Sequence, residues 1–290
     1  MNRVGPLGQL IAAGVLAGGV FLSAQTTVVP EPRRQFGASI TPVYEGWFYN
    51  QDGSRSFLIG YYNRNSRQEL DIPIGPNNRI EPGGPDLGQP THFMTGRQWG
   101  IFTVPAPRDF QPTDAYTWTL TANGQTTSIP FRLHPDYVMA PFSEIAVGNT
   151  PPAIRFDQNG DTVQGPRAHI AAAVTRTATV GTPLSLDIWA VDDMKFTSGT
   201  NAPMSTPRPP VTITVSKYRG PGLVTVEKNK PAVEKIAGSG AAFTGKASTA
   251  VTFSQPGDYV LHVIANDYSG DGGQGFGCCW TTALVKVSVK

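Results

Sequence analysis

Apolar and polar residues alternate along four runs in the C-terminal part of the chain. The runs are Leu184–Val191, Val211–Val215, Tyr259–Ala265 and Ala283–Val289. Successive side chains of a β-strand point to opposite faces, so a period of two places the apolar residues of each run on one face. The pattern predicts four strands of a β-sandwich, and it puts His262 on the outward face of its strand.

A hairpin is predicted where Asn-Gly stands between two alternating runs. The runs are Ala115–Thr121 and Gln125–Phe131, and the dipeptide is Asn123-Gly124. A two-residue Asn-Gly loop favours a type I′ turn, because both of its residues adopt positive φ. The resulting register places Tyr116, Trp118 and Leu120 on a buried face, and it turns the threonines between them outward.

A second hairpin is predicted at Asp52-Gly53. The flanking runs are Val43–Asn50 and Arg55–Tyr62. A two-residue loop here pairs Trp47 with Leu58 and places Trp47, Tyr49 and Tyr62 on the face away from the core. Exposed aromatic side chains of this kind bind sugars by stacking. We therefore expect an aromatic platform, unless a second layer or a loop covers it.

The N-terminus has the pattern of a secretory signal peptide. Arg3 supplies a positive charge, and Leu7–Ala24 is nearly all apolar and ends on a small residue. The alternative is an uncleaved anchor, since the apolar run is just long enough to span a membrane. With cleavage, the chain is secreted or periplasmic in the cell envelope and keeps no membrane span.

These patterns predict an all-β protein with two immunoglobulin-like β-sandwich domains in tandem. The predicted segments are a signal peptide at 1–24, a linker at 25–38, the N-terminal sandwich at 39–133, a proline-rich junction at 134–167 and the C-terminal sandwich at 168–290. The junction lacks sustained periodicity, and we expect it to be a linker.

Composition excludes several classes of protein. The 32 Gly and 26 Pro disfavour a coiled coil or helical bundle, and a net charge of +2 disfavours a nucleic-acid binder. No catalytic motif occurs, so an enzyme is not expected. One alternative is a secreted hydrolase with its site under the long 75–97 loop, and another is a subunit of a surface assembly whose sheet edges pair with neighbours.

A family resemblance is carried by two segments of the C-terminal region. Pro256-Gly257-Asp258-Tyr259, the strand VLHVIA and Asn266-Asp267 resemble the penultimate strand of bacterial PKD-like and immunoglobulin-like extracellular modules. The segment from Ala178 to Pro183, followed by LSLDIWAVDD, resembles their early strand. The resemblance covers about residues 168–290 and implies a non-catalytic module for adhesion, spacing or carbohydrate contact. The N-terminal domain resembles no characterised family.

The immunoglobulin-like topology would bring acidic residues from two loops to one end of the sandwich. They are Asp192, Asp193, Asn266, Asp267 and Asp271. Hard oxygen ligands converging from loops suit Ca²⁺, so calcium is the candidate cofactor. The alternative is turn chemistry, since Asp and Asn favour strand ends.

Cys278 and Cys279 are the only cysteines, and they are adjacent. Three states stay open from the sequence: a disulfide between the neighbours, two thiols that are reduced or bind a soft metal, and bridges to another chain.

A candidate ligand-binding surface combines the aromatic platform with the 75–97 loop. Its residues are Trp47, Tyr49, Tyr62, Arg79, His92 and Arg97. The expected partner is a cell-surface polysaccharide or an envelope protein.

Overall fold

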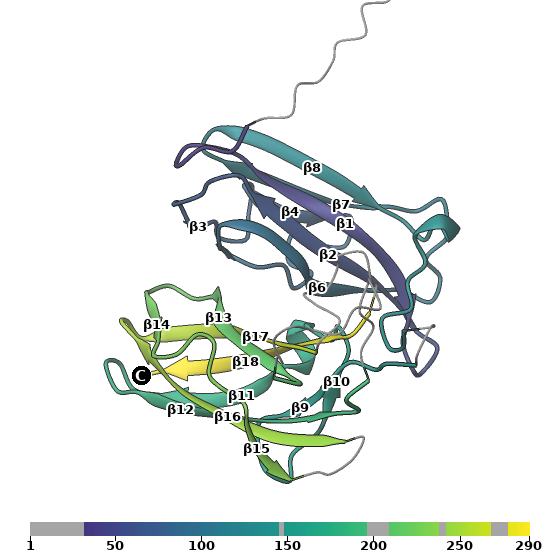
Figure 1. Cartoon of the computed structure of the whole chain (residues 1–290). Coiled ribbons are helices and arrows are strands. Elements are labelled where there is room, and N and C mark those ends of the chain that lie inside the picture. Colours follow the sequence, from purple (N-terminus) through teal and green to yellow (C-terminus); the bar gives the residue numbers. More distant parts are fainter. Residues whose placement is uncertain (1–31, 145–147, 196–208, 238–241, 268–277) are drawn as a thin grey trace, which may run out of the picture. The chain divides into compact units, whose positions relative to one another are not determined.

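The structure is a computed structural model that describes residues 32–144, 148–195, 209–237, 242–267 and 278–290 (Figure 1). Within these ranges the regular elements are β-strands and two short 3-10 helices, η1 (Pro135–Tyr137) and η2 (Ile170–Ala172). The all-β prediction is therefore confirmed. The span from Pro32 to Lys290 forms one compact unit. The predicted signal peptide lies outside the described residues.

The N-terminal sandwich consists of two three-stranded sheets, with the orders β1-β2-β6 and β4-β7-β8, and a small β3-β5 pair. The bounds are β1 Ile40–Tyr49, β2 Arg55–Asn63, β3 Leu70–Asp71, β4 Asn78–Glu81, β5 His92–Phe93, β6 Gly96–Ala106, β7 Tyr116–Ala122 and β8 Gln125–Phe131. Aromatic rings fill the space between the sheets. Phe57 meets Phe131 at 5.0 Å between ring centroids, and Phe102 meets Trp118 at 5.2 Å.

A buried asparagine holds the long 75–97 connection in place. Asn78 is fully buried; its side-chain amide donates to the carbonyls of Ile72 and Pro90, and its oxygen accepts from the indole of Trp118. A buried amide that left any of these groups unpaired would cost about 1–3 kcal/mol, so its full set of partners fixes the loop against the core. The connection is thus an ordered part of the sandwich.

The Asn123-Gly124 hairpin has the predicted register. Trp118 pairs with Ile129, and the turn residues have φ of 50° and 75°, as a type I′ turn requires. Trp118 is fully buried, whereas Thr121 lies on the outward face with its hydroxyl against that of Thr126.

The Asp52-Gly53 hairpin differs from the prediction by one residue. Trp47 pairs with Phe57, not with Leu58, and its side chain is only 6% exposed. The reason is the loop length: Asn50 and Ser54 close the turn through a backbone hydrogen bond of 2.7 Å, which leaves three loop residues instead of two. Because the side-chain period is two, this slip turns Trp47 into the core, and the predicted aromatic platform does not form.

The C-terminal sandwich also has two sheets. One has the order β10-β9-β12-β16-β14, with β15 also on β16, and the other has the order β11-β18-β17-β13. The bounds are β9 Ala153–Arg155, β10 Val163–Gln164, β11 Val174–Ala178, β12 Leu184–Asp192, β13 Thr212–Arg219, β14 Val224–Val226, β15 Glu234–Ala237, β16 Phe243–Phe253, β17 Gly257–Asn266 and β18 Trp280–Val289. The four alternating runs of the sequence lie in β12, β13, β17 and β18, and their predicted apolar faces line one core.

Part of the proline-rich stretch expected to be a linker belongs to this sandwich. β9 and β10 pair with each other, and β9 pairs with β12, where Ile154 lies opposite Ala190. Ile154 and Phe156 are buried in the C-terminal core. Strands of two and three residues are too short to show a period in the sequence, so only tertiary pairing reveals them.

The second face of β17 and β18 is buried as well. Tyr218, Val260 and Leu284 belong to the same buried cluster as the N-terminal core. His262 is 1% exposed, so the prediction that it faces solvent is wrong: its face packs against the N-terminal sandwich instead of water. We call this contact, made by the outer face of β13, β17 and β18, the seam.

Polar contacts at the rim of the seam attach it to the 75–97 connection. The hydroxyl of Tyr218 donates to the carbonyl of Gly88 at 2.6 Å, and the Arg219 guanidinium binds both oxygens of Asp86 at 2.8 and 3.0 Å. Burial raises the pKa of Asp86, but hydrogen bonds from Arg219 and the Gly88 amide outweigh this and hold the pKa below its usual range. The loop that we considered as the lid of a hydrolase site is therefore the attachment between the two sandwiches.

We expect the two sandwiches to unfold together because they share the seam. Leu284→Ala removes a side chain that is 2% exposed, which should cost about 2–5 kcal/mol. Hydrogen exchange under denaturant should then show equal losses of protection in β2 and β12. A loss confined to β12 would show that the sandwiches are independent.

His262 should make stability fall between about pH 6.5 and pH 4. Burial lowers the pKa of His262 to about 4, so below pH 6.5 the unfolded chain takes up a proton that the folded chain refuses. The loss should level off below pH 4 at about 3 kcal/mol, since each pKa unit corresponds to 1.36 kcal/mol. His262→Phe should remove this part of the pH dependence in urea titrations. Parallel curves for the variant and the wild type would contradict the buried neutral ring.

Candidate functional site

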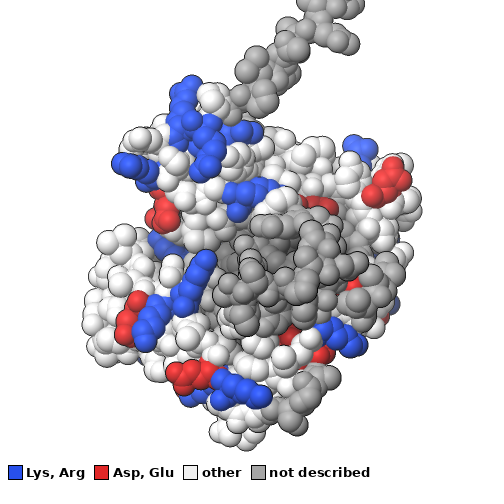
Figure 2. Space-filling model, in the orientation of Figure 1, with Lys and Arg blue, Asp and Glu red and all other residues white. Residues whose placement is uncertain are grey.

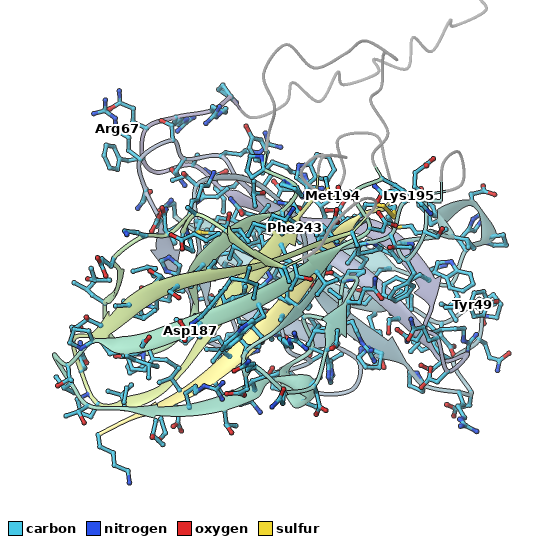
Figure 3. The ribbon with its side chains drawn as sticks, turned by 60° about the horizontal axis from the view of Figure 1, so that its bottom comes forward. Tyr49, Arg67, Asp187, Met194, Lys195 and Phe243 are labelled. Atoms are coloured by element: carbon cyan, nitrogen blue, oxygen red, sulfur yellow. A yellow bond between two sulfur atoms is a disulfide. The ribbon has the colours of Figure 1, made fainter. Side chains whose placement is uncertain are left out.

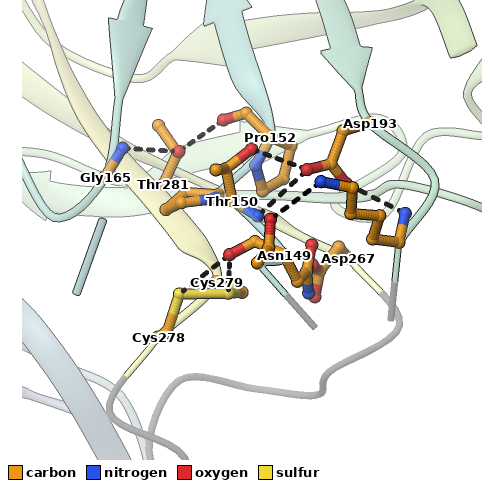
Figure 4. The surroundings of a disulfide bond; sticks show 12 residues. Asn149, Thr150, Pro152, Gly165, Asp193, Asp267, Cys278, Cys279 and Thr281 are labelled. Atoms are coloured by element: carbon orange, nitrogen blue, oxygen red, sulfur yellow. Dashed lines mark hydrogen bonds between the residues drawn. A yellow bond between two sulfur atoms is a disulfide. The ribbon is translucent and has the colours of Figure 1, made fainter. Parts of the chain in front are cut away.

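The loops that leave β12 and β17 meet at one end of the C-terminal sandwich, together with the segment that precedes β9 (Figure 4). Asn149 donates its side-chain amide to Asp267 at 2.6 Å. The backbone amide and hydroxyl of Thr150 both donate to Asp193, at 3.2 and 3.0 Å. We call this end of the sandwich the tip. Asp271, which was predicted to join it, lies outside the described residues.

Asp192 is the most perturbed group of the tip. It is 3% exposed; one carboxyl oxygen accepts from the Met194 amide at 2.8 Å, and the other is buried and lacks a hydrogen-bond partner among the described residues. Burial raises the pKa of Asp192 to about 7, with the nearby charges of Asp267 and Asp193 acting in the same direction. Near neutral pH this carboxyl therefore titrates, and below it carries a proton.

The predicted calcium site is not assembled by the described part of the tip. Within that part, no three His, Cys, Asp or Glu side chains are arranged to hold a metal ion. The oxygens of Asp193 are engaged by the amides of Thr150 and Lys195 and by the Thr150 hydroxyl. A proton on Asp192 reduces the repulsion among these carboxylates without a cation, and calcium binding stays a prediction.

The two cysteines form a disulfide with each other beside the acidic residues (Figures 3 and 4). Cys278 is 4% exposed and Cys279 is fully buried, and the Sγ of Cys279 lies 3.5 Å from the Asn149 carbonyl oxygen. The bridge thus lies against the same segment that contacts Asp193 and Asp267. Through this contact the segment that leads into β18 lies against the tip.

Trp280 connects the disulfide to the seam. It packs with Phe48 and Leu58 of the N-terminal sandwich in a small buried cluster. Gly100 makes room for the indole, because a Cβ at this position would lie 2.9 Å from the ring. The residue directly after the disulfide is therefore buried against the N-terminal sandwich.

The predicted ligand-binding residues are not brought together on one surface. Trp47 is buried and donates its indole N–H to the His134 carbonyl, whereas Tyr49 is 57% exposed and points outward (Figure 3). Tyr62 pairs with Thr41, at the other end of β1. These positions show that the aromatic residues are separate features of the hairpin.

The charged members of the predicted surface are engaged in separate ion pairs. Arg79 binds Glu81 at 2.8 Å and Arg97 binds Glu45 at 2.6 Å. His92 lies between two carboxylates. Burial raises the pKa of Glu45, and the Arg97 charge opposes that rise. The Arg97–Glu45 pair joins β6 to β1 and the His92–Asp71 contact joins β5 to β3, whereas Arg79 and Glu81 both lie on β4.

A groove on the outer face of β11, β18 and β17 was missed from the sequence. Its cavity measures about 620 Å³. Two polar rows cross it: Thr175 is paired with Lys286, and Thr177 with Ser288, which is in turn opposite Asp258. Further lining residues include Ile170, Val260 and Arg219. The only signal in the sequence is the set of polar positions in VTRTA, GDYV and VKVSV.

Comparisons with known proteins identify no family. No protein-family description matches the chain, and no curated protein matches it. Among solved structures, domains 4 and 5 of the S-layer protein SbsC align with this chain at 10% sequence identity. The alignment covers 87% of this chain and 98% of that chain, and its TM-score is 0.23. The titin fragment A168169 aligns with 13% identity, 86% and 98% coverage and a TM-score of 0.23.

A third solved structure that aligns is the sialic acid binding region of a Streptococcus sanguinis SK1 adhesin bound to 3'sLn. It has 12% identity, 88% coverage of this chain, 78% of that chain and a TM-score of 0.21. TM-scores this low identify neither a family nor a function.

Across the described ranges, no helix combines the length and apolarity needed to cross a membrane.

Asp192→Asn should stabilise the protein at alkaline pH. The folded pKa of about 7 lies above the unfolded value, so the contribution of Asp192 to wild-type stability is greatest below about pH 4 and is lost as pH rises through 7. An amide imitates the neutral acid, and we expect a gain on the order of 3 kcal/mol at pH 8 and little change at pH 4. Urea unfolding at both pH values measures this. Asp193→Asn is the control and should destabilise the protein, because it disturbs the contacts to Thr150. A loss of stability in Asp192→Asn at pH 8 would contradict a protonated carboxyl.

Proposed function

We propose that this chain is an exported, non-catalytic binding protein of the cell envelope or the extracellular space. The groove on β11, β18 and β17 carries the proposal. Its volume, about 620 Å³, falls in the range of small-ligand sites, and its polar groups converge from three neighbouring strands. A site on paired strands presents these groups in a fixed arrangement.

The chemistry of the groove favours an acidic saccharide. Thr175, Thr177 and Ser288 supply hydroxyls that can both donate and accept, as sugar hydroxyls do. Lys286 is half-buried, and no carboxylate among the described residues forms an ion pair with it. A ligand carboxylate beside Lys286 would provide that partner, while Val260 contributes apolar floor. Envelope polysaccharides that contain uronic acids have both kinds of group.

The composition of the groove supports binding in preference to hydrolysis. Glycoside hydrolysis ordinarily uses two carboxyl groups on either side of the scissile bond. The groove contains one, Asp258. The shallow hollow along the 75–97 loop likewise contains one, Glu81, and this carboxylate is paired with Arg79.

The disulfide supports export. Disulfides persist in oxidising compartments such as the periplasm and the exterior, and they are rare in the cytosol. Cys278 and Cys279 are bonded to each other at a buried position of the fold. The apolar run at 7–24 favours the same location.

Lys286 provides the test of the proposed site. Affinity electrophoresis through gels that contain polygalacturonate should retard the wild type, whereas neutral dextran should not. Lys286→Glu should weaken retardation by at least about tenfold, because it replaces attraction by repulsion at the ligand carboxylate. Lys230→Glu makes the same change of charge at an exposed position outside the groove and should behave as the wild type. Equal retardation of both variants would refute the groove as the site, and release of reducing ends would refute a non-catalytic role.

A further inference from the structure

Arginines gather at the place where the described chain begins. Backbone hydrogen bonds hold the segment after Pro32 against the loop that follows β2: Arg34 donates to the Arg64 carbonyl at 3.1 Å, and Arg67 donates to the Gln35 carbonyl at 3.1 Å. This pairing sets Arg33, Arg34, Arg64 and Arg67 side by side. Figure 2 shows Lys and Arg side chains clustered at the top of the molecule, where the described chain starts in Figure 1.

Three of these four arginines have no carboxylate partner among the described residues. Arg33, Arg34 and Arg67 are exposed, and none of them forms an ion pair with a described residue. Glu69, the acidic residue that follows Arg67 by two positions, contacts His92 at 3.2 Å. Because the whole chain has a net charge of only +2, this face is far more positive than the average surface.

An exposed aromatic side chain lies within the same segment. Phe36 is 59% exposed, although the next residues, Ala38 to Ile40, are buried. Basic residues around a projecting Phe are the combination that binds membrane interfaces: the charges attract anionic lipids, and the ring enters the boundary between headgroups and acyl chains. We call Arg33, Arg34, Phe36, Arg64 and Arg67 the arginine patch.

The position of the patch along the sequence favours a lipid surface. The apolar run ends at Ala24, and eight residues (25–32) separate it from Arg33. Eight residues and the bonds that flank them reach at most about 30 Å, so a bilayer that receives the run lies close to the patch. If the signal is cleaved after Ala24, the patch begins eight residues beyond the new N-terminus.

We propose that the arginine patch binds anionic lipid headgroups and holds the protein against the membrane. This binding is separate from the saccharide groove, because none of the patch residues lines that cavity. The groove and the patch would let the protein contact a membrane and a polysaccharide together. Removal of either site should leave the other functional.

The test compares the partition of the full chain between vesicles of neutral phosphatidylcholine and vesicles that also contain 30% phosphatidylglycerol. The apolar run contributes equally to partition into both kinds of vesicle. The ratio of the two partition coefficients therefore measures the attraction between the charges of the protein and the anionic lipid. Each arginine near an anionic surface contributes about fivefold. The variant Arg33→Gln/Arg34→Gln/Arg67→Gln should therefore lower the ratio on the order of 100-fold, and salt near 0.5 M should abolish the wild-type ratio.

Two matched variants make the result decisive. Arg33→Lys/Arg34→Lys/Arg67→Lys keeps the charge and should keep most of the ratio. Arg108→Gln/Arg132→Gln/Lys228→Gln removes three exposed charges elsewhere and should keep it as well. Phe36→Ser should weaken partition into anionic vesicles a few-fold. A wild-type ratio near one, or equal losses in the patch and remote variants, would overturn the proposal. Binding to soluble polyphosphate as tight as binding to vesicles would overturn the assignment to lipid.

Discussion

The burial of both faces of β17 and β18 is the constraint on which the rest of the structure depends. An antiparallel sheet ordinarily keeps one face in water, but here Leu261 and His262 point to opposite faces and both are buried. The inner face completes the C-terminal core. The outer face supplies Val260 and Leu284 to the core of the other sandwich. The 75–97 connection follows from this arrangement, since Tyr218 and Arg219 hold it at the rim.

The sequence predicted those parts of the fold whose signal is local. Alternation over seven or more residues located β12, β17 and β18, and Asn123-Gly124 fixed a register. Asp52-Gly53 misled because its neighbours offer another closure: the Asp52 carboxylate accepts from the Ser54 amide at 3.0 Å, which stabilises a loop with one more residue. That single slip moved Trp47 from a predicted binding surface to the core.

In the candidate sites, too, the features with a local sequence signal were predictable and those that depend on tertiary burial were not. The tip was predictable because loop positions follow from sandwich topology, and Asp193 and Asp267 do converge on residues 149 and 150. The protonation of Asp192 was not predictable, since its raised pKa depends on burial that no short motif encodes. The groove escaped notice because polar positions on an outward strand face look alike whether they are solvated or line a cavity. The burial of His262 was missed for a related reason: the alternation puts it on the face away from its own core, and does not show that a second sandwich covers that face.

Trp280 has a consequence for the order in which the protein is made. Phe48 and Leu58 emerge early from the ribosome, but the indole that covers them belongs to the last strand of the sequence. Contacts across more than two hundred residues form slowly, since the chain between them must first be brought together. During synthesis the N-terminal sandwich therefore presents an unfilled apolar hollow beside Gly100, of the kind that chaperones recognise. We expect this hollow to stay open until the final strand of the sequence arrives.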